Sequence, residues 1–363
     1  MEIQALTPAS LLAFIQSDTY ARMPVVPISP QRAWSHIHNP RVDPTDQVLF
    51  LAWDNGQLAG YLGVLADAIY VDGTRHKAGW LSCMWVDPAI RGKGIAKQLL
   101  HAVLASWENR ILVTEFTVAA KGLYDRSEAF QDLVQPTGLR CYLRLNLHEL
   151  LPRRVPRLRP LTGVLRALDA AANAAGDLRF RLFRQPDTLR FTVTRYVDHT
   201  LDAFIQARQD GQLTRRTAAD LNWMLQYPWL VAAPGPDAVS TRYHFSSVAT
   251  RTESCILRLT APDGTLAGMM MLSIRERHLK VPYWYVLPEW QEAAVRLLTG
   301  YMIQAGVDMV SAFHPALCEG LRAPGLPFWH RRALHRHYII SKVFGAPPAA
   351  VWLQDGDADC GFT

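Results

Sequence analysis

Residues 91–96 read Arg-Gly-Lys-Gly-Ile-Ala, and this stretch decides how the rest of the 363-residue chain is interpreted. It lies between a strand-like run, Trp80–Val86, and a helical pattern from Ile95 to Trp107. A glycine-broken turn that opens a helix presents unpaired amides and the positive end of the helix dipole. Gly92 and Gly94 lack a Cβ, so an anion can approach the main chain closely. We therefore expect a phosphate-bearing ligand at the start of this helix.

Two common phosphate-binding motifs do not fit this turn. A P-loop needs Gly-Lys-Ser/Thr, which does not follow, and the dinucleotide fingerprint needs Gly-x-Gly-x-x-Gly with an acidic residue about 20 positions later. The remaining alternative to a ligand site is a helix that simply begins after two glycines.

The spacing around the turn resembles a known signature. The order strand, Val86-Asp87-Pro88, Arg91-x-x-Gly94-x-Ala96 and amphipathic helix resembles the acyl-CoA motif of the GNAT (GCN5-related N-acetyltransferase) superfamily. The resemblance implies acetyl-CoA as acyl donor and no metal. It implies that the loop amides hold the pyrophosphate, while the preceding strand pairs with the pantetheine arm and polarises the thioester. The expected cofactor-binding residues are Met84, Trp85, Val86, Arg91, Gly92, Lys93, Gly94, Ile95 and Ala96.

Composition describes a globular protein of two domains. The chain is 49% hydrophobic and 19% charged, and it has neither a basic leader nor an apolar run of membrane-spanning length, so we expect a cytoplasmic location. The net charge of +6 suits an anionic ligand without requiring nucleic acid. An odd number of scattered cysteines fits a reducing compartment and neither a metal site nor a disulfide framework. The cysteines are Cys83, Cys141, Cys255, Cys318 and Cys360.

The two halves share an order of elements. Gly-x-Leu-Ala-Gly occurs at residues 56–60 and 264–268, and Trp85-Val86-Asp87-Pro88 has a counterpart in Tyr285-Val286-Leu287-Pro288. We therefore predict an α/β (α+β) protein of two tandem GNAT-like domains. Each has a mixed, mostly antiparallel sheet flanked by helices and closed by its own last strand. The expected segments are a GNAT domain (1–150), an arginine-rich linker (151–187), a degenerate GNAT-like domain (188–345) and a C-terminal tail (346–363).

The second copy lacks the glycine loop. There Pro288 leads directly to Glu289 and Glu292, and carboxylates in a first helical turn repel a pyrophosphate. We expect this copy not to bind CoA.

Two residues are predicted to carry proton transfer. The family pattern Leu-Tyr-x-x-x-Gly-Phe resembles Leu123-Tyr124 followed by Phe130, which implies Tyr124 as the acid that protonates the thiolate. The match departs from the family, because no glycine precedes the aromatic residue, which lies one position late. Amines have a pKa near 10.4, so a base is needed. Glu115, in the apolar run 111–116, is the candidate base, with Asp87 and Asp67 as weaker alternatives.

Several other reactive side chains are given ordinary roles. His36 and His38 lie where the family usually lines its acceptor pocket, but a surface role is expected. Cys83 is expected to be an apolar filler, because no base stands near it. Three histidines near the second half's end are interpreted as a basic face and not as metal ligands. They are His330, His335 and His337.

The linker is strongly basic, with eight arginines against two acids between Leu151 and Gln185. We expect a solvated segment with a short helix over about 161–175. A peripheral contact with an anionic lipid surface or polyanionic partner is the alternative. Monomer and dimer both remain open.

The predicted activity is acyl-CoA-dependent N-acetyl transfer directly to an amine acceptor. We expect a small molecule such as an amino sugar, because no peptide- or nucleic-acid-reading motif is seen. Acetylation of protein amines and a non-catalytic CoA-binding or scaffold module stay as alternatives. The intact loop argues against a related tandem family that transfers aminoacyl groups from tRNA.

Overall fold

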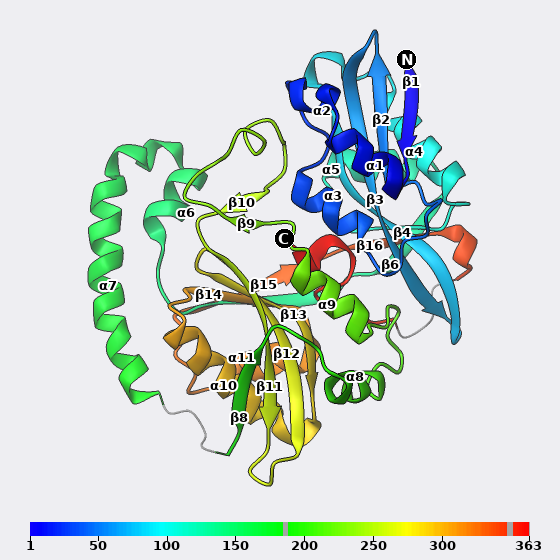
Figure 1. The fold of residues 1–363 in the computed structure, drawn as a ribbon. Helices are drawn as coiled ribbons and strands as arrows, with labels where there is room; N and C mark the ends of the chain where they lie inside the picture. The colour runs from blue at the N-terminus through cyan, green and yellow to red at the C-terminus, as the bar shows by residue number, and fades with distance from the viewer. Residues whose placement is uncertain (184–187, 347–350, 363) are drawn as a thin grey trace. The chain divides into compact units, whose positions relative to one another are not determined.

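A computed structural model describes residues 1–183, 188–346 and 351–362 (Figure 1). The chain divides into two compact units that are not continuous in sequence. Unit 1 consists of Met1–Pro136, Arg195–Cys255 and His335–Thr363, and unit 2 of Thr137–Thr194 and Ile256–Leu334. Residues 184–187 of the predicted linker, with Arg184, and residues 347–350 of the predicted tail lie outside the described residues.

Unit 1 is built on a sheet in which seven strands are described, and most neighbours run antiparallel. The exception is β4 with β5, which are parallel. In spatial order the strands are β1 (Glu2–Leu6), β2 (Leu49–Asp54), β3 (Gln57–Val71), β4 (Thr74–Val86), β5 (Ile111–Val113), β16 (Tyr338–Ser341) and β6 (Phe130–Val134).

Helix α4 (Ile95–Ser106) packs on this sheet because its apolar residues repeat at helical spacing. They are Ile95, Leu99, Leu100, Val103 and Leu104. Glycines in the strands below allow the close approach. A Cβ built at Gly79 would lie 2.4 Å from a methyl carbon of Val64 and 3.1 Å from the Trp107 ring. A side chain there would push the helix away from the sheet.

Unit 2 repeats the same strand order. In spatial order its described strands are β8 (Arg190–Thr194), β11 (Thr252–Thr260), β12 (Leu266–Arg275), β13 (His278–Val286), β14 (Met309–Ala312), β7 (Thr137–Tyr142) and β15 (His330–His335). The parallel pair again follows the long hairpin, as β13 with β14. The predicted fold class, two mixed α/β sheets with flanking helices, is confirmed.

The halves exchange a strand, which the sequence did not reveal. Each half was expected to close its own sheet. Instead β7, from the N-terminal half, pairs with β14 in unit 2, and β16, near the C-terminus, pairs with β5 in unit 1. The chain passes from β6 to β7 through Pro136 and from β15 to β16 through Arg336, and these turns carry it from one sheet to the other. Neither unit is therefore one continuous stretch of the sequence.

Buried ion pairs hold the later segments of unit 1 to β3. Arg216 forms a bidentate pair with Asp67, at 2.9 Å for both bonds, and also bonds to Asp357 at 3.0 Å. Arg41 joins Asp67 to Asp220, at 2.7 and 2.6 Å. Residues 351–362, predicted as part of a tail, are thus partly buried in unit 1 and end in the 3₁₀ turn η5 (Ala358–Phe362).

The remaining elements surround the sheets. Unit 1 holds α1 (Pro8–Ile15), α2 (Asp18–Arg22), α3 (Pro30–Ile37), α5 (Val118–Arg126), α8 (His199–Gln206), α9 (Ala218–Gln226) and a small parallel pair, β9 (Val231–Ala232) with β10 (Val248–Ala249). Unit 2 holds α6 (Leu147–Arg154), α7 (Thr162–Leu182), α10 (Gln291–Gln304) and α11 (Pro315–Arg322). The linker helix α7 is longer than expected. In the described chain, no helix combines the length and apolarity needed to cross a membrane.

Candidate active site

The predicted phosphate loop has the backbone that anion binding needs. It follows the 3₁₀ turn η1 (Pro88–Ile90), which Asp87 caps by accepting a bond from Ala89 N at 2.9 Å. Gly92 and Gly94 have φ of 88° and 78°, values that side chains rarely adopt. A Cβ at either glycine would have nothing within 4 Å. The loop is therefore an exposed, open cradle.

The amides of the cradle are free to bind a ligand. The first backbone bond into α4 runs from Gln98 N to Gly94 O at 3.1 Å. Among the described residues, no main-chain acceptor is bonded by the amides of residues 92–97. Gly94 is the N-cap and no acidic residue occupies the first turn. Unpaired amides at a positive helix end are suited to a phosphate, so the residues present fit the pyrophosphate of CoA.

The strand before the loop offers a free edge. Strand β4 pairs with β5 only at Gly79 and Trp80, so its end, residues 81–86, has no described partner strand on that side. A bulge against β3 lies near Cys83, whose φ is 54°. Met84, Trp85 and Val86 beyond it are half-buried. Free backbone groups there can pair with an extended amide such as the pantetheine arm.

Tyr124 lies on α5, in the helix that follows β5. Its side chain is buried, with Phe116 and Phe130 edge-on at 5.9 and 5.5 Å between ring centroids. Burial raises the pKa of Tyr124 above that of a free phenol. The hydroxyl therefore keeps its proton near neutral pH, as a proton donor must.

Glu115 does not lie in the apolar strand that made it a candidate. Strand β5 ends at Val113, and Glu115 has φ of 53° with a side chain that is 57% exposed. It accepts a hydrogen bond from Arg336 Nε at 2.8 Å. The apolar environment that made Glu115 a candidate base is therefore absent.

The two weaker base candidates have structural partners. Asp87 caps η1. Burial alone would raise the pKa of Asp67, but Arg216 and Arg41 outweigh it and hold this pKa at about 2. An acid so strongly held in its ionised form is a poor base for an amine.

A buried polar cluster covers the bulged part of β4, and sequence reasoning missed it. Arg32, on α3, donates to Ser82 and Cys83 and lies 3.7 Å over the ring of Trp229. Tyr243 and Asp359 complete the cluster. Tyr243, Trp229 and Asp359 come from segments assigned to other domains, so no local pattern joins them to β4.

Two expectations fail at this cluster. Cys83 is not an apolar filler but contacts a guanidinium, although burial raises the pKa of its thiol and keeps it protonated. His36 is not at the surface. It is 1% exposed and stacks on Trp229, and burial, assisted by Arg32, lowers its pKa to about 3. His38 is exposed, as expected, and stacks on Tyr227.

An aromatic stack stands beside the cluster. Trp85 lies between Tyr61 and the exposed His244, at centroid distances of 5.4 and 4.6 Å. The free end of β4 is thus flanked by segment 243–245 of unit 1. This side of β4 therefore presents aromatic faces and a buried cation.

The late histidines have separate partners. His337 Nε2 bonds to Asp132 at 2.7 Å in unit 1, whereas His330 stacks on Tyr142 in unit 2. Within residues 1–183, 188–346 and 351–362, no group of three or more His, Cys, Asp or Glu side chains is placed to hold a metal.

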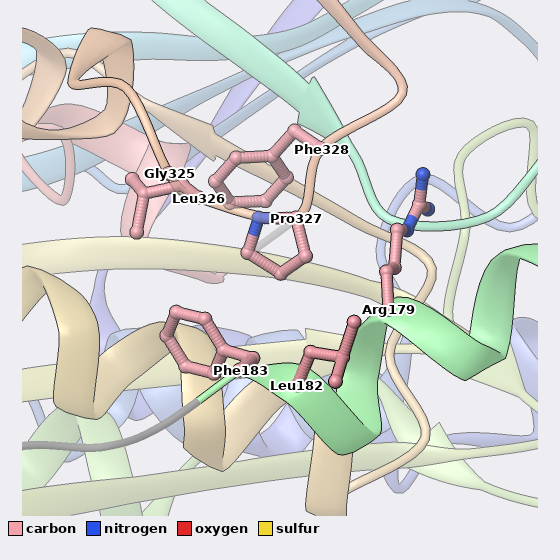
Figure 2. A pocket seen from close by; sticks show the side chains of 7 residues that line it. All are labelled: Arg179, Leu182, Phe183, Gly325, Leu326, Pro327 and Phe328. Carbon is pink, nitrogen blue, oxygen red and sulfur yellow. The ribbon is translucent and has the colours of Figure 1, made fainter.

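A shallow hollow of about 320 Å³ lies in unit 2, at the C-terminal end of α7 (Figure 2). It is lined by Arg179, Leu182, Phe183, Gly325, Leu326, Pro327 and Phe328. This lining offers one cation but no acid, base or nucleophile, so it does not supply the chemistry of acyl transfer.

The second copy is closed where the first is open. After η3 (Pro288–Trp290), α10 begins at once with Gln291. The Gln291 side chain donates to Val286 O at 2.7 Å and accepts from Trp284 Nε1 at 2.8 Å. With Glu292 in the first turn, this helix start offers neither a cradle nor a positive field.

Comparison with known proteins agrees with the family resemblance of the loop at residues 91–96. Residues 13–129 match the sequence model of the Acetyltransferase (GNAT) family. No curated protein matches the chain. A probable N-acyltransferase from Enterococcus faecalis has a similar structure, with a TM-score of 0.50 and 10% identity over 94% of this chain and 72% of its own. At that identity the likeness shows the fold alone.

Two further solved structures are similar at a lower level. A GCN5-related N-acetyltransferase from Kribbella flavida has a TM-score of 0.48 and 12% identity, covering 93% of this chain and 71% of its own. A tandem GNAT protein from the clavulanic acid biosynthesis pathway has a TM-score of 0.47 and 13% identity, covering 96% and 99%. Scores below 0.5 support no conclusion here. The family model thus matches the part of unit 1 that contains the cradle, and the likeness to the solved structure agrees in fold.

Proposed function

We propose that unit 1 transfers the acetyl group of acetyl-CoA to the amine of a small molecule. The observation that carries this is the open amide cradle of residues 92–97 beside the unpaired end of β4. Hydrogen bonds to charged oxygens contribute about 1.5–3 kcal/mol each, so several amides outweigh the exposed cations of the loop. The cradle places the donor, and β4 aligns its acyl end.

The proposed chemistry needs two proton transfers. The acceptor nitrogen forms a bond to the thioester carbonyl carbon, and the carbon–sulfur bond breaks. Tyr124 donates its proton to the leaving thiolate; burial keeps the phenol protonated, although the raised pKa makes it a weaker acid. Glu115 is the proposed base that takes the amine proton through water. Its side chain is 57% exposed and is paired with Arg336, so water can reach it.

The acceptor is proposed to enter along the face of β4 that carries Trp85 and His244. Stacked aromatic rings suit the flat or apolar side of a small molecule such as an amino sugar. Neither side chain restricts the acceptor to one compound, so a panel of amines is required.

The test measures free CoA thiol released from acetyl-CoA across amino sugars, polyamines, amino acids and lysine peptides. Turnover on a small amine above the no-acceptor rate is the expected result. Turnover confined to peptides would replace the proposed acceptor with protein amines. CoA binding without turnover on any amine would favour a binding module instead.

A further inference from the structure

Helix α7 is fixed to unit 2 by hydrogen bonds from one of its faces. It runs unbroken from Thr162 to Leu182 (Figure 1). Asp169, Asn173 and Asp177 each hydrogen-bond to residues of segment 144–148, at 2.8, 2.8 and 3.2 Å. These three are spaced four residues apart, so they define one side of the helix.

The opposite side of α7 is an exposed apolar stripe. Its members are spaced 4, 3, 4, 3 and 4 residues apart, the heptad pattern of a helix–helix seam. We call them the outer stripe: Val164, Leu168, Ala171, Ala175, Leu178 and Leu182. The four large members are 58%, 56%, 59% and 78% exposed in this order. Apolar residues that share one face and remain in water indicate a binding surface.

The outer stripe is symmetric about Asn173. Read from either end, it gives two large side chains, two alanines and two large side chains, at the same spacing. An antiparallel copy therefore sets Val164 against the partner copy's Leu182, Leu168 against Leu178 and Ala171 against Ala175. A two-fold axis requires a surface that is complementary to itself, and this stripe meets the requirement.

We propose that a second copy of this chain binds through the outer stripe of α7 as an antiparallel helix pair. The alanines at the centre permit close approach of the two helices, while the large side chains fill the ends. Antiparallel helices also place opposite ends of their dipoles together. A helix lying on a membrane has a broader apolar face with aromatic residues, whereas the outer stripe is narrow and has none.

The interface is small. A 21-residue helix is about 30 Å long, and one such pair falls at the low end of specific interfaces. We therefore expect a weak dimer, in which monomer and dimer exchange at working concentrations.

Two adjacent alanines allow a matched test. Ala171 belongs to the outer stripe, and Ala170 is exposed but lies off it. Sedimentation velocity from about 1 to 100 μM is measured for the wild type, Ala171→Asp and Ala170→Asp, with helical content checked by circular dichroism. The wild type and Ala170→Asp should dimerise, and Ala171→Asp should weaken dimerisation at least about 30-fold. A wild type that stays monomeric at 100 μM, or two variants that dimerise equally, overturns the proposal.

Cysteine pairs test the orientation. Leu168→Cys and Leu178→Cys proteins, mixed and mildly oxidised, should cross-link to each other more than either does alone. Efficient cross-linking of Leu168→Cys with itself would indicate a parallel pair and overturn the antiparallel arrangement. Binding of a monomeric wild type to phosphatidylserine vesicles, lost in Ala171→Asp, would assign the outer stripe to a membrane instead.

Discussion

The starts of α4 and α10 are the most instructive comparison in the molecule. Both helices follow the same elements: a long hairpin, a strand ending in valine and a 3₁₀ turn begun by proline. Four residues, Arg91–Gly94, separate turn from helix in unit 1, and none does in unit 2. The helix start in unit 1 leaves its amides open. In unit 2 the Gln291 side chain bonds to Val286 O at the helix start, and Glu292 lies in the first turn.

This difference shows that the frame and the site are separable. Strand order and the parallel pair recur in both sheets, so the fold does not depend on the loop. A short insertion with two left-handed glycines gives unit 1 the open helix start that unit 2 lacks. Variants and a change of pH test this difference between the two units.

Gly94→Glu should have the largest effect. It forces a side chain into a φ of 78° and adds a carboxylate where the pyrophosphate is proposed to bind. Loss of two amide contacts, at about 1.5–3 kcal/mol each, predicts CoA binding at least about 100-fold weaker by calorimetry. Gly264→Glu is the matched control in unit 2, because Gly264 has φ of 86° and equally open space. Equal affinity in both variants would contradict the cradle.

Tyr124→Phe should lower kcat about 100-fold and leave CoA binding unchanged, because general-acid contributions are typically 10²–10⁴. In unit 2 the corresponding position by sequence order holds Arg322, so that copy lacks this acid. Thiol release under saturating acceptor gives kcat, and calorimetry gives the affinity. Tyr20→Phe, which removes another buried hydroxyl of unit 1, is the control. Equal rates in both would leave Tyr124 a packing residue.

Acid should destabilise unit 1 through Asp67. Its pKa is about 2 in the folded protein and near 3.9 when unfolded. A lowered folded pKa gives stability that is complete above about pH 5 and is lost as pH falls through about 2. Between pH 6 and pH 3 the expected loss is about 1 kcal/mol of unfolding free energy. Urea melts at pH 6 and pH 3 should show it, and Asp67→Asn, less stable at pH 6, should lose this part of the dependence. An unchanged slope would show that other carboxylates dominate.

Glu115→Gln should have the smallest effect, a fall in kcat of about tenfold, because its side chain is 57% exposed and solvent can take over part of the proton transfer. Glu128→Gln is a close control: Glu128 is exposed and has φ of 56°, against 53° for Glu115. The rate of thiol release under saturating acceptor should fall in the first variant only. No difference between the two would leave deprotonation to solvent.

The sequence predicted what is local and missed what is distant. The loop at residues 91–96, the helix after it and the repeated order of elements follow from glycines, periodicity and repeated strings, and the structure confirms their positions. Strand exchange depends on pairing of β16 with β5 across more than 200 residues, which no periodicity records. The cluster around Arg32 includes Trp229, Tyr243 and Asp359, which are also far from β4 in the sequence. Glu115 was misplaced because an apolar run continued past the end of β5.

Strand exchange also sets the order in which the protein can be completed during synthesis. Unit 2 has all its residues once Leu334 leaves the ribosome, but the sheet of unit 1 still lacks β16. Until then β5 and β6 have an unsatisfied edge, a state prone to aggregation. Unit 1, which is translated first, thus completes its sheet last. A protein fragment ending after the first half should fail to fold, however complete its motif.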